Sequence, residues 1–304
     1  MAFCNTKKMF EKALKEKYAV GAFNIYDVYS AKAVIDASEK TGKDIIVQVS
    51  EKTCDLLGAK VIADFVKALA FNAKNMVALH LDHGKSFESC KNAILAGFSS
   101  VMIDGSALPY EENVKLTKKV CDFAHKNKVS VEGELGQIGG VEDNVSASVN
   151  LTDPRAVFDF VNRTGVDSLA IAVGTAHGVN KGVKIPVIHY DIIEEVSAML
   201  PNFPLVCHGA STVEKTLVDK LINFGGEVKK AQGIDILDLK KMADTNICKI
   251  NMDSDLRLVY TASVREMLKN NPYEIDPRNI LAFAENELSK HIQKVILEIL
   301  VGQK

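Results

Sequence analysis

The chain has 304 residues, with 37 basic and 39 acidic side chains and a formal net charge of −2 at pH 7. This balance gives no reason to expect nucleic acid or an anionic membrane surface as a partner, so an anionic ligand would have to be bound by a few local donors. Apolar residues make up 47% of the chain. No window approaches the roughly 18 uninterrupted apolar residues of a membrane span, so we expect a soluble globular protein.

Residues 1–18 have the pattern of an amphipathic helix. They lack the continuous apolar stretch and the small-residue cleavage site of a signal peptide. The cysteines are not spaced as in a zinc ribbon or a redox motif, and several lie in apolar runs. They are Cys4, Cys54, Cys90, Cys121, Cys207 and Cys248. We therefore expect buried, reduced thiols in a cytoplasmic protein.

Short apolar runs rich in β-branched residues alternate with longer segments of helical period. Strands are predicted at Tyr18–Asn24, Asp44–Ser50, Met76–Asp82, Ser99–Ser106, Val129–Gly136, Ser168–Gly174, Pro204–Ala210 and Cys248–Asp255. Helices are predicted at Ser30–Thr41, Lys60–Ala73, Ser86–Ala96, Tyr110–Lys126, Asp153–Thr164, Tyr190–Leu200, Glu214–Phe224 continuing through Ile236–Asp244, Tyr260–Leu268 and Ile280–Val301. This alternation predicts an α/β fold, a closed (β/α)8 TIM barrel of parallel strands.

An open, doubly wound sheet is the alternative fold. Such sheets usually bind nucleotides through a glycine-rich turn after the first strand. Here the first strand runs into Asn24–Asp27, which contains no glycine. No linker rich in Pro, Gly or Ser interrupts the chain, so we expect one domain over residues 1–304.

Polar residues gather at the carboxyl ends of the predicted strands, where the active sites of such barrels are built. They are Asn24, Ser50, Asp82, His83, Asp104, Glu132, Glu134, His177, His208, Asn251 and Asp253. One polar residue at a strand end is unremarkable, but polar residues at nearly all of them indicate a shared site.

Three histidines, His83, His177 and His208, lie at or just past three different strand ends. Three imidazoles with one open position are the ligand set of a catalytic zinc ion, although a phosphate-binding or general-base role could explain any one of them. His80 is expected one layer deeper in the barrel, as a core residue or as a support for the ligands. The remaining histidines are expected to be ordinary helix residues: His125, His189 and His291.

Five segments together resemble the class II aldolases, the zinc enzymes that split fructose or tagatose bisphosphate. They are His80–Gly84, Glu132–Gly136, Gly174–Gly178, His208–Ser211 and Lys249–Asp255, and the resemblance runs from about Ala19 to Arg278. It implies a lyase of glycolysis and gluconeogenesis that reversibly cleaves fructose 1,6-bisphosphate to dihydroxyacetone phosphate and glyceraldehyde 3-phosphate.

The resemblance also implies roles in catalysis. His83, His177 and His208 match the zinc ligands, with Asp104 and Glu134 as second-site or alternate ligands. Asp82 matches the acid/base at the C4 hydroxyl, although orientation of a histidine is an alternative role. Glu142 matches a loop carboxylate that moves the proton at dihydroxyacetone phosphate, with a solvated loop acid as the alternative, and Asn251 matches an amide that contacts the triose. A monovalent cation is a further possible requirement.

The substrate-binding residues follow from the same resemblance: Asn24, Ser50, Gly178, Lys181, Gly209, Ser211, Asp253, Ser254, Arg257 and Arg278. Glycines at 178 and 209 let backbone N–H groups approach one phosphate closely. Ser50 and Arg257 match the residues that bind the far phosphate, and Arg278 is a weaker match. In the family the arginine that Arg257 matches comes from a neighbouring subunit, which implies a homodimer or larger oligomer.

Three other functions remain open. A tagatose-1,6-bisphosphate aldolase is the nearest, but Asp253 and Arg257 favour the fructose substrate. A metal-dependent barrel hydrolase usually has a His-x-His pair, and the sequence has none. A non-catalytic barrel with a binding role would be expected to have lost a zinc ligand or Asp82, and all are present.

Overall fold

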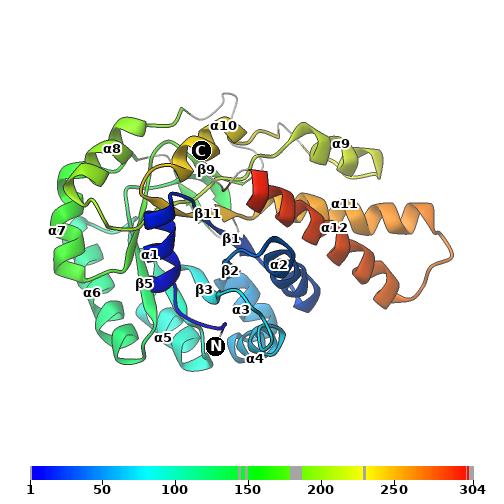
Figure 1. Cartoon of the computed structure of the whole chain (residues 1–304), viewed down its shortest axis with the longest axis horizontal. Helices are drawn as coiled ribbons and strands as arrows, with labels where there is room; N and C mark the ends of the chain where they lie inside the picture. The colour runs from blue at the N-terminus through cyan, green and yellow to red at the C-terminus, as the bar shows by residue number, and fades with distance from the viewer. Residues whose placement is uncertain are drawn as a thin grey trace.

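The computed structural model describes residues 2–142, 145–147, 150–178, 187–228, 231–298 and 300, and it describes the side chains of these residues outside 140–147. Eight parallel strands close a barrel in the order β1-β11-β10-β8-β5-β4-β3-β2 (Figure 1). These strands are β1 (Val20–Asn24), β2 (Ile45–Ser50), β3 (Val77–Gly84), β4 (Ser100–Ile103), β5 (Ser130–Leu135), β8 (Ser168–Ile171), β10 (Leu205–Cys207) and β11 (Ile247–Met252). The predicted TIM barrel and its eight strand positions are confirmed.

Helices surround the barrel (Figure 1). They are α1 (Lys7–Glu16), α2 (Val28–Thr41), α3 (Glu51–Leu57), α4 (Ala59–Leu69), α5 (Phe87–Ala96), α6 (Tyr110–Lys126), α7 (Pro154–Thr164), α8 (Tyr190–Met199), α9 (Lys215–Asn223), α10 (Ile236–Ala243), α11 (Ser254–Asn270) and α12 (Pro277–Glu298). Helices α11 and α12 lie side by side and extend away from the barrel, and α12 also packs on α2. No helix in the described part of the chain has the length and apolar character needed to cross a membrane.

The barrel strands are buried on both faces, because helices cover the outside and side chains fill the inside. This explains why they read in the sequence as nearly continuous apolar runs. At the amino-terminal end of the barrel, α1 packs Met9, Phe10 and Ala13 against inward-facing residues such as Ile46 and Ala78. Burial of each large apolar side chain contributes roughly 1.5–3 kcal/mol. That end is therefore closed by hydrophobic packing, and the polar strand ends lie at the opposite end.

Several predicted boundaries were wrong. The eighth strand was predicted to reach Asp255, but it ends at Met252, and the helix predicted from Tyr260 already begins at Ser254. The helix predicted to run on from Phe224 is divided into α9 and α10. Gly225 has a φ of +83°, a conformation that favours glycine and ends helices, and Asp235 caps the start of α10 by accepting from the N–H of Leu237 at 2.8 Å.

Four further elements were not predicted. Helix α3 is short and begins directly after β2, where the Ser50 side chain caps it. Strands β6 (Gly139–Glu142) and β7 (Val145–Ala147) form an antiparallel hairpin, and β6 also pairs with β9 (Ala176–His177). This small second sheet brings the segment after β5 beside His177.

Candidate active site

A β-bulge at the end of β3 positions two of the predicted site residues. Successive side chains of a regular strand point to opposite faces. Here the register with β4 shifts between Leu81 and Gly84, and His83 adopts a φ of +47°. A bulge re-aims side chains in this way, so Asp82 and His83 both face the barrel mouth, with Asp82 Oδ1 3.9 Å from His83 Nε2. A side chain at Gly84 would place Cβ 2.7 Å from the Met102 carbonyl oxygen, which explains the glycine.

The structure brings the three predicted metal-binding histidines together. His83, His177 and His208 are 8%, 3% and 0% exposed, and each offers a ring nitrogen within 4.8 Å of those of the other two. His83 Nε2 and His208 Nδ1 face each other at 3.0 Å. Two converging imidazole nitrogens and a third nearby fit a zinc ion, because tetrahedral zinc favours such donors and keeps its fourth position for substrate.

The electrostatic surroundings of His83 and His208 shift their pKa values in opposite directions. Burial lowers the pKa of His83, but the carboxylates of Asp82, Asp104 and Glu134 outweigh it and raise the pKa to about 10. Burial and the neighbouring His83 lower the pKa of His208 well below its ordinary value. Of the two facing rings, His83 therefore binds a proton more strongly, and its Nε2 must be free of a proton to act as a ligand.

A second group of potential ligands shares His83. Its Nδ1 lies 3.0 Å from Asp104 Oδ2 and 3.7 Å from Glu134 Oε2. That Glu134 oxygen is buried and has no hydrogen-bond partner among the described residues. Burial and the charge of Asp104 raise the pKa of Glu134 well above its ordinary range. The predicted role of Asp104 and Glu134 as alternate ligands is chemically reasonable and stays a prediction.

Sequence reasoning missed the network beneath the histidines. Glu132 accepts from Lys249 Nζ at 2.8 Å, and its other oxygen contacts His208 Nε2 at 2.7 Å. Lys249 is completely buried and also lies 3.3 Å from His80 Nε2, while His80 Nδ1 contacts Ser100 Oγ at 2.8 Å. The sequence does contain an indication of this network, because a lysine within the apolar run Ile247–Met252 must have a buried partner. His80 thus has the supporting position rather than a ligand position.

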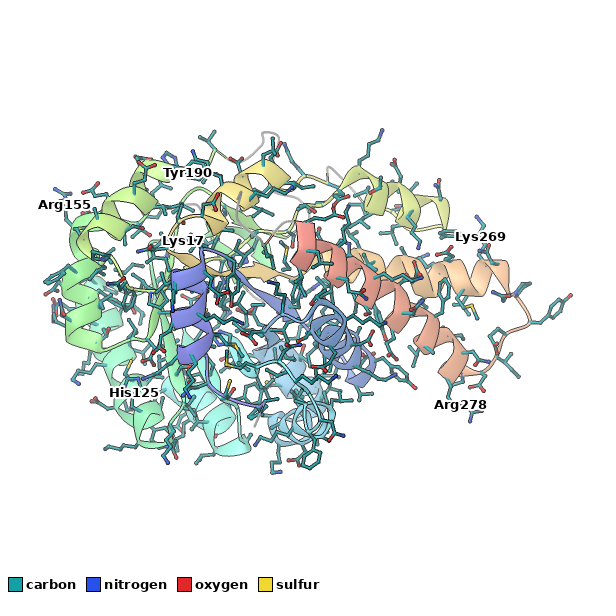
Figure 2. All side chains as sticks on the ribbon, in the orientation of Figure 1. Lys17, His125, Arg155, Tyr190, Lys269 and Arg278 are labelled. Atoms are coloured by element: carbon teal, nitrogen blue, oxygen red, sulfur yellow. The ribbon has the colours of Figure 1, made fainter. Side chains whose placement is uncertain are left out.

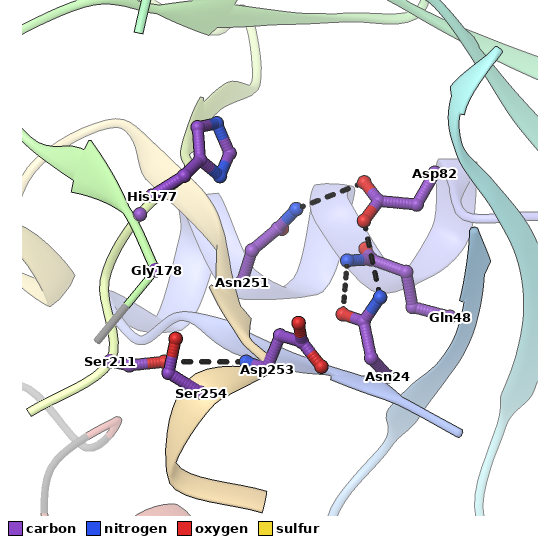
Figure 3. Close-up of a pocket in the computed structure, with 10 residues that line it drawn as sticks. Asn24, Gln48, Asp82, His177, Gly178, Ser211, Asn251, Asp253 and Ser254 are labelled. Carbon is purple, nitrogen blue, oxygen red and sulfur yellow. Dashed lines mark hydrogen bonds between the residues drawn. The ribbon is translucent and has the colours of Figure 1, made fainter. Parts of the chain in front are cut away.

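Amides hold the Asp82 carboxylate from two sides (Figure 3). Asn24 Nδ2 donates to Asp82 Oδ2 at 3.2 Å, and Asn251 Nδ2 lies 3.5 Å from Asp82 Oδ1. Gln48 Nε2 in turn donates to Asn24 Oδ1 at 2.9 Å. Gln48 was not predicted, although its place in the apolar run of β2 indicates an inward-facing amide. Asp82 is therefore fixed in the pocket as an oriented acceptor.

The predicted phosphate side lies opposite Asp82 in the same pocket (Figure 3). The lining residues there include Gly178, Gly209, Ser211, Asp253 and Ser254. Gly209 has a φ of +62°, and an added Cβ would lie 2.6 Å from the Ala176 backbone, so glycine is required for this close approach. The Asp253 N–H donates to Ser211 Oγ at 3.3 Å, which joins the two loops that form this side.

Asp253 is held by two neighbours. The Tyr26 hydroxyl donates to its Oδ1 at 2.6 Å, and Arg257 Nε lies 2.7 Å from its Oδ2. Tyr26 was not predicted, since a tyrosine after a strand carries no distinctive pattern. Arg257 lines a neighbouring groove together with Tyr26 and Lys52.

The residues predicted for the far phosphate are not all brought to the pocket within one chain. Ser50 ends β2 opposite Asp82 of β3 and accepts from the Thr53 N–H at 3.4 Å. Arg278 is exposed at the start of α12, pairs with Asp276 at 2.6 Å, and lies at the outer end of the α11–α12 pair (Figure 2). Lys181 and the side chain of Glu142 lie outside the described residues.

The family model, the relatives and the solved structure to which this chain is similar are all aldolases. The family model "Fructose-bisphosphate aldolase class-II" matches residues 4–302. The fructose-bisphosphate aldolase of Treponema pallidum is 42% identical, covering 98% of this chain and 96% of the relative, and that of Thermus caldophilus is 42% identical, covering 96% of each. The crystal structure of the YdjI aldolase from Escherichia coli K12 superposes with a TM-score of 0.80 at 27% identity, covering 99% of this chain and 98% of that one.

Proposed function

We propose a function from the finding that the chain belongs to the class II fructose-bisphosphate aldolase family. The protein reversibly cleaves fructose 1,6-bisphosphate to dihydroxyacetone phosphate and glyceraldehyde 3-phosphate, and it uses one zinc ion per subunit. The observation that carries the proposal is the trio His83, His177 and His208, buried directly beside Asp82 at the barrel mouth. The family likeness supports the reaction and the donor set supports the metal.

The three imidazoles would hold the metal, with Glu132 fixing the ring of His208 through Nε2. The chemistry that zinc supplies at such a site is Lewis-acid polarisation of the substrate carbonyl, which stabilises the charge left when the C3–C4 bond breaks. Asp104 and Glu134 remain proposed as alternate ligands next to His83.

Asp82 would take the proton from the C4 hydroxyl during cleavage and return it during condensation. A general base must lie within hydrogen-bonding reach of the proton that it removes. The bonds from Asn24 and Asn251 leave Asp82 oriented toward the pocket that the substrate would enter. Asn251 would also contact the triose, and Glu142 is proposed to move the proton at dihydroxyacetone phosphate.

The phosphate of the triose would lie between Gly209, Ser211 and the start of α11. The first backbone N–H groups of a helix are unpaired and attract anions. Ser254 is the first residue of the 17-residue helix α11, and it lines the pocket. Gly178 and Lys181 are proposed to complete this phosphate site.

The far phosphate is proposed to bind between Ser50 and Arg257, with Arg278 as a further cation, in a homodimer or larger oligomer. Arg257 is partly exposed beside the groove at Tyr26, from where an adjacent subunit could be reached. We also propose that residues 1–304 form one domain. A cytoplasmic location is proposed as well, supported by six free cysteine thiols.

A coupled cleavage assay with fructose and tagatose 1,6-bisphosphates, before and after thorough chelation, tests the proposal. We expect cleavage of the fructose isomer, loss of activity after chelation and recovery with added zinc. Full activity without metal, or a lysine Schiff base trapped by borohydride, would contradict the zinc mechanism. Cleavage of neither substrate would favour a non-catalytic barrel.

A further inference from the structure

A buried carboxylate outside the pocket binds the loop that follows β10. Asp255 is 0% exposed and is the second residue of α11. Its Oδ2 accepts from the Thr212 N–H at 2.8 Å and from the Thr212 hydroxyl at 2.9 Å, and its Oδ1 accepts from the Val213 N–H at 2.7 Å. Short hydrogen bonds to a carboxylate are stronger than neutral ones, so this side chain fixes two consecutive loop residues.

The loop is strained at the point where Asp255 binds it. Val213 has a φ of +46°, in the left-handed region that β-branched residues rarely adopt. Its side chain is 5% exposed and packs with Leu221 and Leu258. A strained conformation persists only when its surroundings hold it. The bond from the Val213 N–H to Asp255 is one of the contacts that do so.

The same loop forms one wall of the phosphate side. Gly209 and Ser211 precede Thr212, and both line the pocket together with Ser254. Figure 3 shows Ser211 beside Ser254. Behind the loop, the Ile234 N–H donates to the Ser211 carbonyl oxygen at 3.2 Å. Asp255 directly follows Ser254, so its carboxylate joins the helix start that lines the pocket to the loop facing it.

We propose that Asp255 is a positioning residue for phosphate binding. It holds Thr212 in place and Val213 in its strained conformation, and thereby keeps Gly209 and Ser211 beside Ser254. The inference rests on the proposed function, because the phosphate side is assigned there. Asp255 itself lies behind the pocket and does not touch the substrate.

The first test replaces Asp255 by asparagine, which keeps the size but turns an amide NH₂ toward backbone donors. Loss of a contact that is made equally in the ground state and the transition state raises KM without lowering kcat, and we expect the phosphate contacts to behave in this way. We expect KM for fructose 1,6-bisphosphate and the Kd for inorganic phosphate, measured by calorimetry on the zinc-loaded protein, to rise about tenfold. The kcat should change less than about threefold, and the zinc content should not change.

The second test relieves the strain in the Asp255→Asn background. Glycine adopts a positive φ without strain, so adding Val213→Gly should recover most of the lost phosphate affinity. Val213→Ala in the same background is the matched control. It removes nearly the same buried side chain, but alanine cannot adopt a positive φ without strain. Melting temperatures of both double variants separate the lost packing from the recovered binding.

An unchanged KM and phosphate Kd in Asp255→Asn, or equal recovery with glycine and alanine, would overturn the inference. Should Asp255→Asn not fold, Thr212→Val deletes only the hydroxyl bond and should raise both constants about threefold; no change would then overturn it. A wild-type protein that binds phosphate without cleaving the sugar contradicts the proposed function alone, since the calorimetric comparison still decides the role of Asp255.

Discussion

Lys249 and Glu132 form an ion pair at the centre of the barrel, with Nζ 2.8 Å from Oε2 and neither side chain more than 1% exposed. The other oxygen of Glu132 lies 2.7 Å from His208 Nε2. Buried charges are stable only when they are paired and hydrogen-bonded. The pair therefore fixes the ring of His208 so that Nδ1, the atom that faces His83, is presented to a metal.

Replacing Lys249 by methionine should destabilise the protein strongly, because the Glu132 carboxylate would remain buried without its cation. We expect a loss of about 3–5 kcal/mol in the free energy of unfolding. Zinc affinity should fall by about 10- to 100-fold, as is typical when the partner of a ligand is disturbed. Urea denaturation of the metal-free protein and zinc titration measure the two effects.

Two controls accompany this variant. Lys8→Met removes an exposed lysine of α1 and should change neither quantity. Adding Glu132→Gln to Lys249→Met removes the uncompensated charge and should recover part of the stability but not the zinc affinity. A Lys249→Met protein as stable as the wild type would contradict the stabilising role of the pair.

Much of this architecture could be predicted from the sequence. Strands that are covered on both faces have nearly continuous apolar sequences, and the polar residues at their carboxyl ends identify the end of the barrel that holds the site. The histidine trio and Asp82 were found in that way. The bulge at His83 could not be predicted, since it depends on the register between β3 and β4 rather than on a local pattern. The roles of Gln48 and Lys249 depend on partners far away in the sequence.

Asp82→Asn should keep the size of the side chain and the zinc site but lose the base. We expect kcat to fall by about 10²–10⁴-fold, the usual contribution of one acid/base group. Zinc content and the affinity for dihydroxyacetone phosphate should stay close to those of the wild type, because the histidines are unchanged. Activity within a few-fold of the wild type would show that Asp82 only orients its neighbours.

Arg257 pairs with Asp253 of its own chain at 2.7 Å, whereas the family resemblance predicts that it serves the neighbouring subunit. Mixing inactive Asp82→Ala with inactive Arg257→Ala under subunit exchange distinguishes the two roles. If the arginine acts across a two-fold interface, one site of each heterodimer carries neither defect. About a quarter of the wild-type activity should then return.

The matched control mixes Asp82→Ala with His208→Ala, whose defects fall in separate sites of each heterodimer, so no activity should return. Recovery in the control would mean that the subunits exchange whole segments or that a variant is not inactive. If exchange is verified by mass and the Arg257 mixture stays inactive, the arginine acts within its own subunit and the pair with Asp253 is its working contact.

Asp253 should decide between the fructose and tagatose bisphosphates, which differ in the configuration at C4. That hydroxyl also undergoes the proposed proton transfer, so a wrong configuration misplaces the reacting group. A site that hydrogen-bonds a hydroxyl discriminates strongly against an analogue that leaves its polar group unpaired. Water can bridge an inverted hydroxyl more easily than a missing one, so we expect a fructose preference in kcat/KM of about 10²–10⁴, or roughly 3–5 kcal/mol.

Asp253→Ala should shrink that ratio mainly by slowing cleavage of the fructose isomer. Tyr26→Phe is the matched control, because it deletes only the hydroxyl that donates to Asp253 at 2.6 Å and leaves the carboxylate in place. In Tyr26→Phe the ratio of kcat/KM for the fructose isomer to that for the tagatose isomer should fall less than in Asp253→Ala, because Arg257 still pairs with Asp253 Oδ2. An equal or higher kcat/KM of the wild type for the tagatose isomer would overturn the substrate assignment and leave the zinc aldolase mechanism intact.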